Sequence, residues 1–219
     1  MKRLNMKQDE FWESNYIEKQ TMWGFEPADS AIAAKDFFIK EKIADILIPG
    51  IGYGRNARIF LDNGINVTGI EISKTAIDLA KFDNNNMLIY QGSVTDMPFD
   101  NKFYDGIYCY ALIHLLNKRE RKKFIKDCYA QLKPNGWMIF STISKNDSLY
   151  GKGKQLSKNR FLMTSGAKLF FYDSESIKQE FREYGLIDFS EMDESVKFLE
   201  NNPPLKFTVV KCQRRFIEN

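Results

Sequence analysis

The sequence predicts an α/β fold, a doubly wound and mostly parallel sheet with helices on both faces. Three observations support this prediction. An apolar strand, Asp45 to Pro49, opens into a turn that carries Gly50, Gly52 and Gly54. A second strand, Asn66 to Glu71, ends on a carboxylate. Strands and helical segments then alternate along the chain, which is typical of parallel strands joined by crossover helices.

The segments before and after the glycine-rich turn are expected to be helical. Residues from about Asp9 to Lys42 have helical spacing in two pieces, broken near Gly24 and Pro27, because glycine and proline interrupt helices. The turn itself leads into a short helix from Asn56 to Leu61. Ser73 follows the second strand and is a good N-cap, so another helix is predicted to begin there.

The middle of the chain continues the alternation. Short apolar runs predict a third strand at Met87–Gln91 and a fourth at Tyr104–Tyr110. Residues Lys118 to Leu132 have helical spacing and stop before Pro134-Asn135-Gly136, which predicts a turn. Trp137 to Thr142 is expected to form the fifth strand.

The end of the chain predicts an antiparallel strand. Ser174 is expected to cap a helix that Gly185 ends, and strands are predicted at Leu186–Met192 and Leu205–Cys212. The connection between these two strands, which contains Asn201-Asn202-Pro203-Pro204, is too short for a full crossover helix. The last strand is therefore predicted to run antiparallel to its neighbours.

Length and composition predict one enzyme-sized domain. The chain has 219 residues, 43% of them hydrophobic and 28% charged, which is typical of a globular protein. No composition break marks a second domain, so residues 1–219 are expected to form one unit, with 1–42 as a helical cap and 43–219 as the core. The net charge of +3 is too small to indicate a nucleic-acid partner.

The termini and cysteines indicate a cytoplasmic protein without a metal. The polar start, Met1 to Glu10, has no apolar core of a signal peptide, and no apolar run approaches the roughly 20 residues that cross a bilayer. Cys109, Cys128 and Cys212 are far apart, and with a single histidine they make no zinc site of familiar spacing. We expect free thiols, no metal and no membrane partner.

The glycine spacing narrows the choice of nucleotide. Glycines let backbone N–H groups approach a ligand, and a carboxylate about 20 residues later is placed to accept hydrogen bonds from ribose hydroxyls. Dinucleotide sites use G-x-G-x-x-G, but this turn is G-x-G-x-G, and Arg55 stands where the third dinucleotide glycine would be. No Gly-Lys-Ser/Thr follows, so a phosphate loop is absent. The spacing favours an adenosine ligand without a pyrophosphate.

These motifs resemble the class I S-adenosylmethionine-dependent methyltransferases, over about Ile43 to Lys211. The family has an E/D-x-G-x-G-x-G turn and an acidic residue that closes the second strand. The resemblance implies a seven-stranded Rossmann-like sheet and S-adenosyl-L-methionine as cofactor. The I-P-G-x-G-Y-G form here looks most like the thiopurine, halide/thiol and tellurite-resistance methyltransferases, because Ile48 occupies the usual place of the carboxylate two residues before Gly50.

The resemblance also implies a set of cofactor-binding residues. The segment Gln91 to Phe99 is similar to the family's G-D-A-x-D-L-P-F, so Asp96 and the Met97 N–H would meet the adenine between Val94 and Met97. Carbonyls of Cys109 and Tyr110 would bind the methionine ammonium. The expected set is Gly50, Gly52, Gly54, Asn56, Glu71, Ile72, Val94, Asp96, Met97, Cys109, Tyr110 and Trp23. The alternatives are a solvated carboxylate for Glu71 and an Asx-turn for Asp96.

Two further features permit a structural or a functional interpretation. The aromatic N-terminal segment either packs on the sheet through Phe11 and Trp12 or covers the cofactor with Tyr16 and Trp23, whose rings would attract a sulfonium. His114, the single histidine, is tempting as a general base. A lone histidine in apolar surroundings is more often a packed, hydrogen-bonded residue, so no catalytic residue is assigned.

The predicted function is methyl transfer to a small-molecule acceptor by in-line displacement, driven by alignment and desolvation. Two alternatives are kept: a protein that binds S-adenosylmethionine or S-adenosylhomocysteine without catalysis, and a nicotinamide-dependent oxidoreductase. The Lys- and Gly-rich insert 144–172 is expected to be a mobile surface loop, or else a basic lid for an anionic substrate. Within it, Phe170 to Tyr172 either line the acceptor pocket or, more in keeping with their residue types, are buried.

Overall fold

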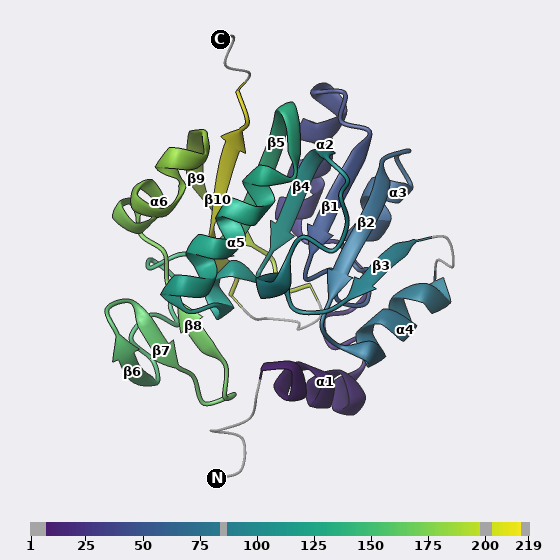
Figure 1. Cartoon of the computed structure of the whole chain (residues 1–219). Coiled ribbons are helices and arrows are strands. Elements are labelled where there is room, and N and C mark those ends of the chain that lie inside the picture. The colour runs from purple at the N-terminus through teal and green to yellow at the C-terminus, as the bar shows by residue number, and fades with distance from the viewer. Residues whose placement is uncertain (1–7, 84–86, 198–202, 216–219) are drawn as a thin grey trace.

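A computed structural model describes residues 8–83, 87–197 and 203–215. Seven strands form one sheet in the order β3-β2-β1-β4-β5-β10-β9 (Figure 1). The pairs among β1 to β5 are parallel, whereas β10 is antiparallel to both β5 and β9. The doubly wound sheet with an antiparallel last strand is therefore confirmed.

The bounds of the elements follow the predicted pattern closely. The sheet strands are β1 (Asp45–Pro49), β2 (Asn66–Glu71), β3 (Leu88–Gln91), β4 (Tyr104–Tyr110), β5 (Leu132–Ile143), β9 (Leu186–Glu194) and β10 (Leu205–Gln213). The helices are α1 (Gln8–Lys19), α2 (Asp29–Lys40), α3 (Ala57–Leu61), α4 (Lys74–Asp83), α5 (Lys118–Ala130) and α6 (Ser174–Phe181). Short 3₁₀ turns lie at η2 (Val94–Asp96), η3 (Ile113–Leu115) and η4 (Arg182–Tyr184).

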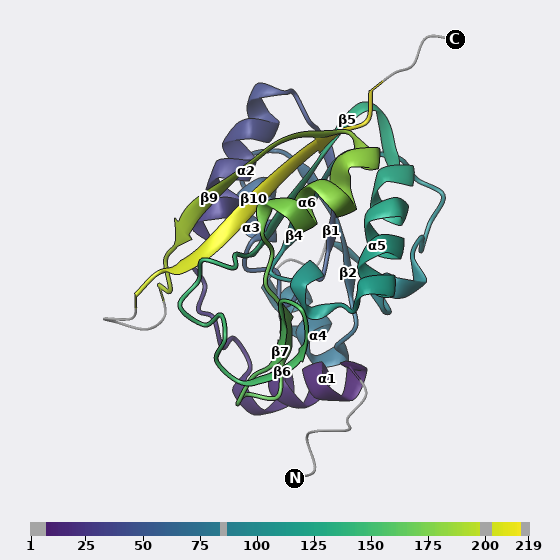
Figure 2. The same cartoon turned by 90° about the vertical axis from the view of Figure 1, so that its left-hand side faces the viewer.

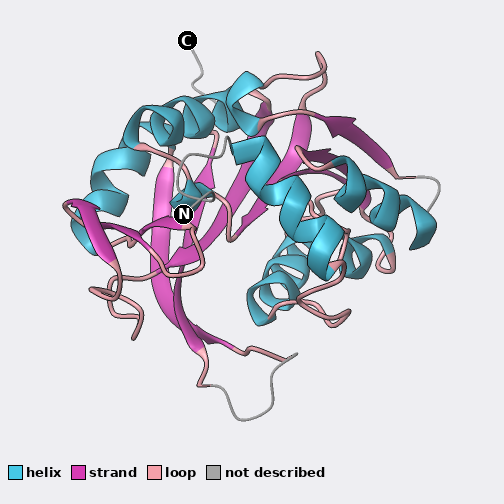
Figure 3. Ribbon diagram, turned by 90° about the horizontal axis from the view of Figure 1, so that it is seen from below, coloured by secondary structure: helices cyan, strands magenta, loops and turns pink. Residues whose placement is uncertain are grey.

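Helices cover both faces of the sheet, as Figures 2 and 3 show. Apolar side chains of α2, α3 and α4 pack with one set of strand residues, and those of α5 and α6 pack with the other set. Strand β4 shows the alternation that produces two cores: Ile107 belongs to the α5–α6 side and Tyr108 to the α2–α3 side. Both side chains are completely buried, so the sheet has the two apolar faces of a parallel α/β fold.

Two local predictions, the N-cap of α6 and the turn before the fifth strand, are wrong in detail. Asp173, not Ser174, is the N-cap of α6, because its carboxylate accepts the Ser176 N–H at 2.9 Å and Ser174 is already helical. The predicted turn at Pro134-Asn135-Gly136 is an irregularity inside β5. There the register with β4 shifts between Tyr104 and Gly106, and Asn135 has a φ of 62°.

The insert between β5 and α6 is more regular than predicted. Instead of a surface loop, it contains a small antiparallel sheet of β6 (Lys154–Ser157), β7 (Arg160–Leu162) and β8 (Lys168–Phe170). Phe161 and Phe171 are buried and pack edge-on, with ring centroids 5.9 Å apart, and give the sheet an apolar side. Phe171 and Tyr172 are buried by packing, which confirms the structural interpretation of these two residues.

The lower edge of the sheet in Figure 1, where the parallel strands end, lies beside α1 and the small sheet. The N-terminal cap thus consists of two helices in different places, since α2 packs on a face of the main sheet and α1 contacts α4. Residues 1–7 and Asn201-Asn202 of the predicted connection lie outside the described residues. Among the helices that the structure describes, none combines the length and apolarity that crossing a bilayer requires.

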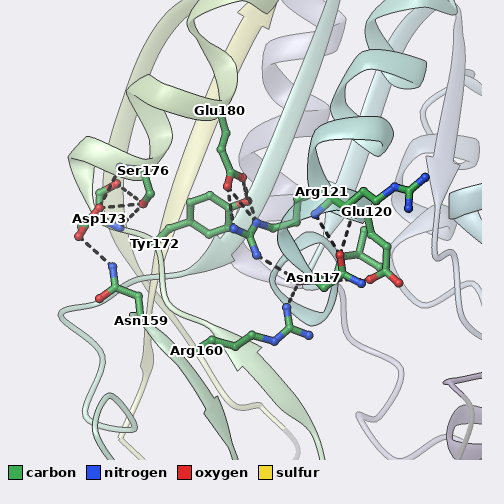
Figure 4. Close-up of polar contacts among 11 residues, drawn as sticks. Asn117, Glu120, Arg121, Asn159, Arg160, Tyr172, Asp173, Ser176 and Glu180 are labelled. Carbon is green, nitrogen blue, oxygen red and sulfur yellow. Dashed lines mark hydrogen bonds and ion pairs between the residues drawn. The ribbon is translucent and has the colours of Figure 1, made fainter. Parts of the chain in front are cut away.

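A buried ion pair fastens the insert and α6 to α5 (Figure 4). Arg121 on α5 donates to both carboxylate oxygens of Glu180 on α6, with a shortest distance of 2.7 Å, and Tyr172 donates to the same carboxylate at 2.7 Å. The Arg121 guanidinium also lies 3.7 Å from the ring centroid of Phe170. From β7, Arg160 donates to the Leu116 carbonyl. The Arg121–Glu180 pair therefore joins α5, α6 and the end of the insert at Tyr172.

Replacing Glu180 by alanine should lower the free energy of unfolding by about 3–5 kcal/mol, because Arg121 would stay buried without a carboxylate. Urea denaturation measures this change. The matched control is Asp78→Ala, which removes the exposed ion pair to Lys74 and should cost less than about 1 kcal/mol. Equal effects of the two substitutions would mean that the buried pair does not carry the stability assigned to it.

Candidate functional site

The glycine-rich turn between β1 and α3 brings backbone close to the end of β2. The N–H groups of Gly50 and Ile51 both donate to the Ile70 carbonyl, at 2.8 and 3.1 Å. Gly52 has a φ of 58°, and a Cβ there would lie 2.8 Å from the Tyr16 hydroxyl oxygen. A side chain at Gly52 would therefore be strained and would displace Tyr16.

Glu71 closes β2 and is held by the backbone around it. Its carboxylate accepts the N–H groups of Gly52, Ile72 and Ser73, each at 2.9 Å. The side chain is buried, and this burial raises the pKa of Glu71 although the three hydrogen bonds act to lower it. The carboxylate is thus fixed in place at the edge of a cavity, rather than solvated at a strand end.

The cavity has a volume of about 340 Å³ and follows the carboxyl ends of the strands. Its wall contains these residues of the predicted cofactor set: Trp23, Gly50, Gly52, Asn56, Glu71, Ile72, Val94 and Tyr110. The volume is in the range typical of small-ligand sites. The structure therefore brings together, around one space, residues that are up to 87 positions apart in the sequence.

Four residues of the predicted set do not line the cavity. Gly54 faces α4, where a Cβ would contact Ala80 and Met87, so this glycine serves packing. Cys109 and Met97 are buried in the core on the α5–α6 side, and Asp96 is exposed. Gly92 and Ser93, which were not predicted, line the cavity at the end of β3. An adenine-binding role of Asp96 and Met97 stays a prediction.

Aromatic residues of the N-terminal segment form one wall. Trp12, Tyr16 and Trp23 line the cavity, and Trp23 stacks on Tyr53 with a centroid distance of 6.2 Å and an interplanar angle of 7°. Tyr16 meets the Trp23 ring edge-on at 5.9 Å. The segment therefore covers the cavity, while Phe11 packs edge-on against Trp12 behind it.

One carboxylate anchors α1 over the cavity. Glu13 accepts hydrogen bonds from the Ser73 hydroxyl at 2.6 Å and the Thr75 hydroxyl at 2.7 Å, at the first turn of α4. Partial burial acts to raise the pKa of Glu13, but these hydrogen bonds outweigh it and lower the pKa. A carboxylate at a helix N-terminus is also favoured by the helix dipole.

At the opposite end of the cavity, the sequence offered only the insert, as an alternative to a surface loop, and it did not predict the residues of β9 and β10. Its wall includes residues of the insert, of the end of β9 and of the start of β10, namely Leu149, Ala167, Leu169, Glu194, Ser195, Val196, Leu205 and Phe207. Glu194 accepts the N–H groups of Asp29 and Ser30 at the start of α2, at 2.6 and 3.2 Å, and burial raises its pKa. No local motif marks these residues, because only the tertiary fold brings them to the cavity.

Arg55 and His114 also belong to the cavity wall. Arg55 donates to the carbonyls of Trp23 and Glu26, at 3.3 and 3.2 Å, and its guanidinium lies 5.6 Å from the Tyr110 ring centroid. His114 is buried, and desolvation lowers its pKa to about 3. A histidine that is neutral throughout the physiological range makes a poor general base, which favours the packed interpretation.

Part of the sequence is similar to a known protein family. Residues 47–140 match the methyltransferase domain family. This methyltransferase segment runs from β1 to β5 and holds the glycine-rich turn, Glu71 and His114. The match supports the predicted methyltransferase activity for this segment, whereas the predicted single domain over residues 1–219 stays a prediction.

Similar proteins extend the comparison. The chain is 32% identical over 113 residues to a ubiquinone biosynthesis O-methyltransferase of Rickettsia akari, which is 50% of this chain and 44% of that protein. The chain thus spans less than half the length of this curated relative. A Burkholderia thailandensis 1,6-didemethyltoxoflavin N1-methyltransferase, solved with S-adenosylhomocysteine, has a TM-score of 0.71 at 15% identity over 95% of this chain and 87% of its own. A Streptomyces caelestis methyltransferase has a TM-score of 0.68 at 16% identity, over 93% and 96%. These structures share the fold.

Substitution of Glu13 by alanine should loosen α1 without unfolding the core, because the hydrogen bonds to Ser73 and Thr75 are lost. Hydrogen exchange followed by mass spectrometry should show faster exchange of the α1 amides, with exchange in β1 and β4 unchanged. Glu10→Ala, on an exposed position of the same helix, is the control and should leave α1 exchange as it is. Unchanged exchange in the Glu13 variant would contradict the anchoring role.

Proposed function

We propose that the protein transfers a methyl group from S-adenosyl-L-methionine to a small-molecule acceptor. The observation that carries this proposal is the buried Glu71 carboxylate, held beside Gly52 at the edge of the cavity. A carboxylate at the end of the second strand suits two adjacent ribose hydroxyls, since charge-assisted hydrogen bonds to both need an anion there. The match of residues 47–140 to the methyltransferase domain family supports the same cofactor.

Different residues of the cavity wall suit the ribose, the adenine and the methionine part of this cofactor. Glu71 would hold the ribose, with Ile72 and Val94 against the adenine, and the backbone of Gly50 and Gly52 would approach the methionine part. The aromatic faces of Trp12, Tyr16 and Trp23 would attract a cationic sulfonium, an effect of about 0.5–2 kcal/mol per good contact. When bound, S-adenosylmethionine supplies an activated methyl group on a positively charged sulfur.

The opposite half of the cavity suits a largely apolar acceptor. Most of the side chains in its wall there are apolar, namely Ile143, Leu149, Leu169, Leu205 and Phe207, and Glu194 and Ser195 are the polar members. The relatives named ubiquinone biosynthesis O-methyltransferases support an oxygen acceptor of this kind. The motif resemblance to thiopurine and thiol methyltransferases favours a sulfur acceptor as the second candidate. No nucleic-acid partner is proposed.

Catalysis in this proposal depends on alignment and on the exclusion of water. With S-adenosylmethionine held by Glu71 and the glycine-rich turn, its methyl group would pass in line to the acceptor oxygen; the sulfur would become a neutral thioether, and the hydroxyl proton would pass to solvent. Because positive charge disappears during the transfer, an apolar cavity covered by aromatic rings favours the transition state. The protein's own contribution is therefore to hold both reactants and to keep the cavity dry.

Calorimetric titration tests the cofactor class directly. S-adenosylmethionine should bind the purified protein and NADH should not. If a folded protein, free of copurified nucleoside, binds only NADH, the oxidoreductase alternative replaces this proposal. Binding of S-adenosylmethionine without methyl transfer to a panel of phenols, thiols and amines would instead support a non-catalytic binding protein.

Changing Glu71 to glutamine should weaken S-adenosylmethionine binding by about 10- to 100-fold, because the charge-assisted hydrogen bonds are worth about 1.5–3 kcal/mol. Glutamine keeps the shape and one acceptor oxygen for the surrounding N–H groups. The control is Asp78→Asn, which removes a carboxylate from the exposed face of α4 outside the cavity and should leave the affinity unchanged. Equal affinities of the Glu71 variant and the wild type would mean that the ribose is held elsewhere.

A further inference from the structure

The tautomer of His114 is fixed by the backbone. The Ile143 N–H donates to Nδ1 of His114 at 3.2 Å, and a backbone N–H can act only as a donor. Nδ1 therefore carries no proton, and the Thr142 hydroxyl, 3.2 Å from the same nitrogen, also donates to it. In the neutral ring the proton consequently lies on Nε2.

The Nε2–H group has no hydrogen-bond partner among the residues that the structure describes. Within the part of the chain that the structure describes, both hydrogen-bond contacts of His114 go to Nδ1. Among the described residues, the fully enclosed side-chain atoms without a partner are Gln131 Oε1 and Ser141 Oγ, so Nε2 is not sealed inside the core. His114 is 5% exposed and belongs to the cavity wall. The Nε2–H is thus a nearly buried donor without an acceptor. Because an unpaired buried donor destabilises the protein, this group is available to bind a ligand in the cavity.

His114 lies in the half of the cavity away from Glu71. It follows β4 in η3, accepts from β5, and meets the Phe207 ring of β10 edge-on at 6.1 Å. In the sheet order, β5 and β10 lie on one side of β4, whereas β2, which ends on Glu71, lies on the other side beyond β1. His114 therefore lies on the β5–β10 side of the cavity, away from the strand that carries Glu71.

We propose that the Nε2–H of His114 donates a hydrogen bond to an oxygen of the methyl acceptor and so positions it. This inference rests on the proposed methyl transfer. The largely apolar wall and this neutral donor fit a planar, mostly apolar molecule that carries a phenolic, enolic or carbonyl oxygen. His114 acts here as a positioning and specificity-determining residue, and it neither gains nor loses a proton during the transfer.

The charge state of the ring agrees with this role. Burial lowers the pKa of His114 to about 3, so the ring keeps one proton at neutral pH. The other titratable groups along the cavity wall are Tyr16, Tyr53, Arg55, Glu71, Tyr110 and Glu194. Neither carboxylate among them forms an ion pair or a hydrogen bond with His114 in the described residues, so nothing there opposes the effect of burial.

Nuclear magnetic resonance of protein labelled with ¹⁵N-histidine tests the tautomer without any activity assay. His114 is the only histidine, so its two ring nitrogens give an unambiguous signal pair. We expect the Nε2–H tautomer with no titration from pH 8 to pH 5, and a shift of the Nε2–H signal when 4-methylcatechol is added to protein saturated with S-adenosylhomocysteine. A protonation midpoint near 6.5, an Nδ1–H tautomer, or no shift with bound catechol overturns the inference.

Two amide substitutions of His114 distinguish the role of Nε2 from that of Nδ1. Glutamine at position 114 can place an N–H near the position of Nε2, whereas asparagine reaches only the position of Nδ1. We expect His114→Asn to raise the KM for 4-methylcatechol by about 3- to 10-fold, the size of one neutral hydrogen bond, and His114→Gln to raise it less than 2-fold. S-adenosylmethionine affinity should stay the same in both.

The outcomes distinguish the two proposals. A wild-type protein that does not bind S-adenosylmethionine overturns the proposed function itself. If the wild type binds it and methylates 4-methylcatechol, but the glutamine and asparagine variants have equal KM values, only the role of His114 is wrong. A wild type that methylates thiols and no oxygen-bearing ring also overturns the inference about the acceptor. The measurement on wild-type protein stands even if a variant fails to fold.

Discussion

The hydrogen bond from the Gly52 N–H to the Glu71 carboxylate is the contact on which the rest of the site depends. It joins the turn after β1 to the end of β2, two neighbouring parallel strands whose ends define the cavity edge. The N–H groups of Ile72 and Ser73 hold the same carboxylate, so its position is set by backbone alone. Because the group is buried, its two oxygens can be satisfied only by these donors and by a ligand in the cavity.

Ser73 connects this carboxylate to the covering helix. Its N–H donates to Glu71, and its hydroxyl donates to Glu13 of α1. The residue that helps fix one edge of the cavity therefore also anchors the helix that carries Trp12 and Tyr16 over it. At the other end, Arg121 and Glu180 hold the insert, whose Leu149 and Leu169 form part of the apolar wall. Each end of the cavity is thus closed by an element that a buried or partly buried carboxylate holds in place.

Local sequence patterns predicted most of the fold and the end of the cavity around Glu71. The strands from β1 to β5, and the glycine turn with Glu71, are visible because residue type and spacing determine them directly. Gly54 shows the limit of a motif, since the same spacing places it against Ala80 rather than at the cavity. Asp173 and Ser174 are adjacent residues that both cap helices well, and the sequence does not distinguish them.

The other half of the cavity depends on contacts between distant segments. Glu194 reaches the wall because β9 ends beside the start of α2, some 165 residues earlier in the chain. The insert was predicted to be a loop because lysines and glycines outnumber its short apolar runs. The two runs that contain Phe161 and Phe171 are too short to indicate strands by themselves, and their rings pack together only in the folded chain. The packed role of His114 was foreseen from its apolar neighbours, but its tautomer required the position of the Ile143 N–H.

The most direct test of the central claim is hydrogen exchange in the presence and absence of S-adenosylhomocysteine. The ligand should slow exchange together in three segments that only the fold brings together: residues 50–54, residues 71–73 and helix α1. The last strand, β10, should change only near Phe207. Protection confined to one of these segments, or protection on the far edge of the sheet, would contradict a cavity organised around Gly52 and Glu71.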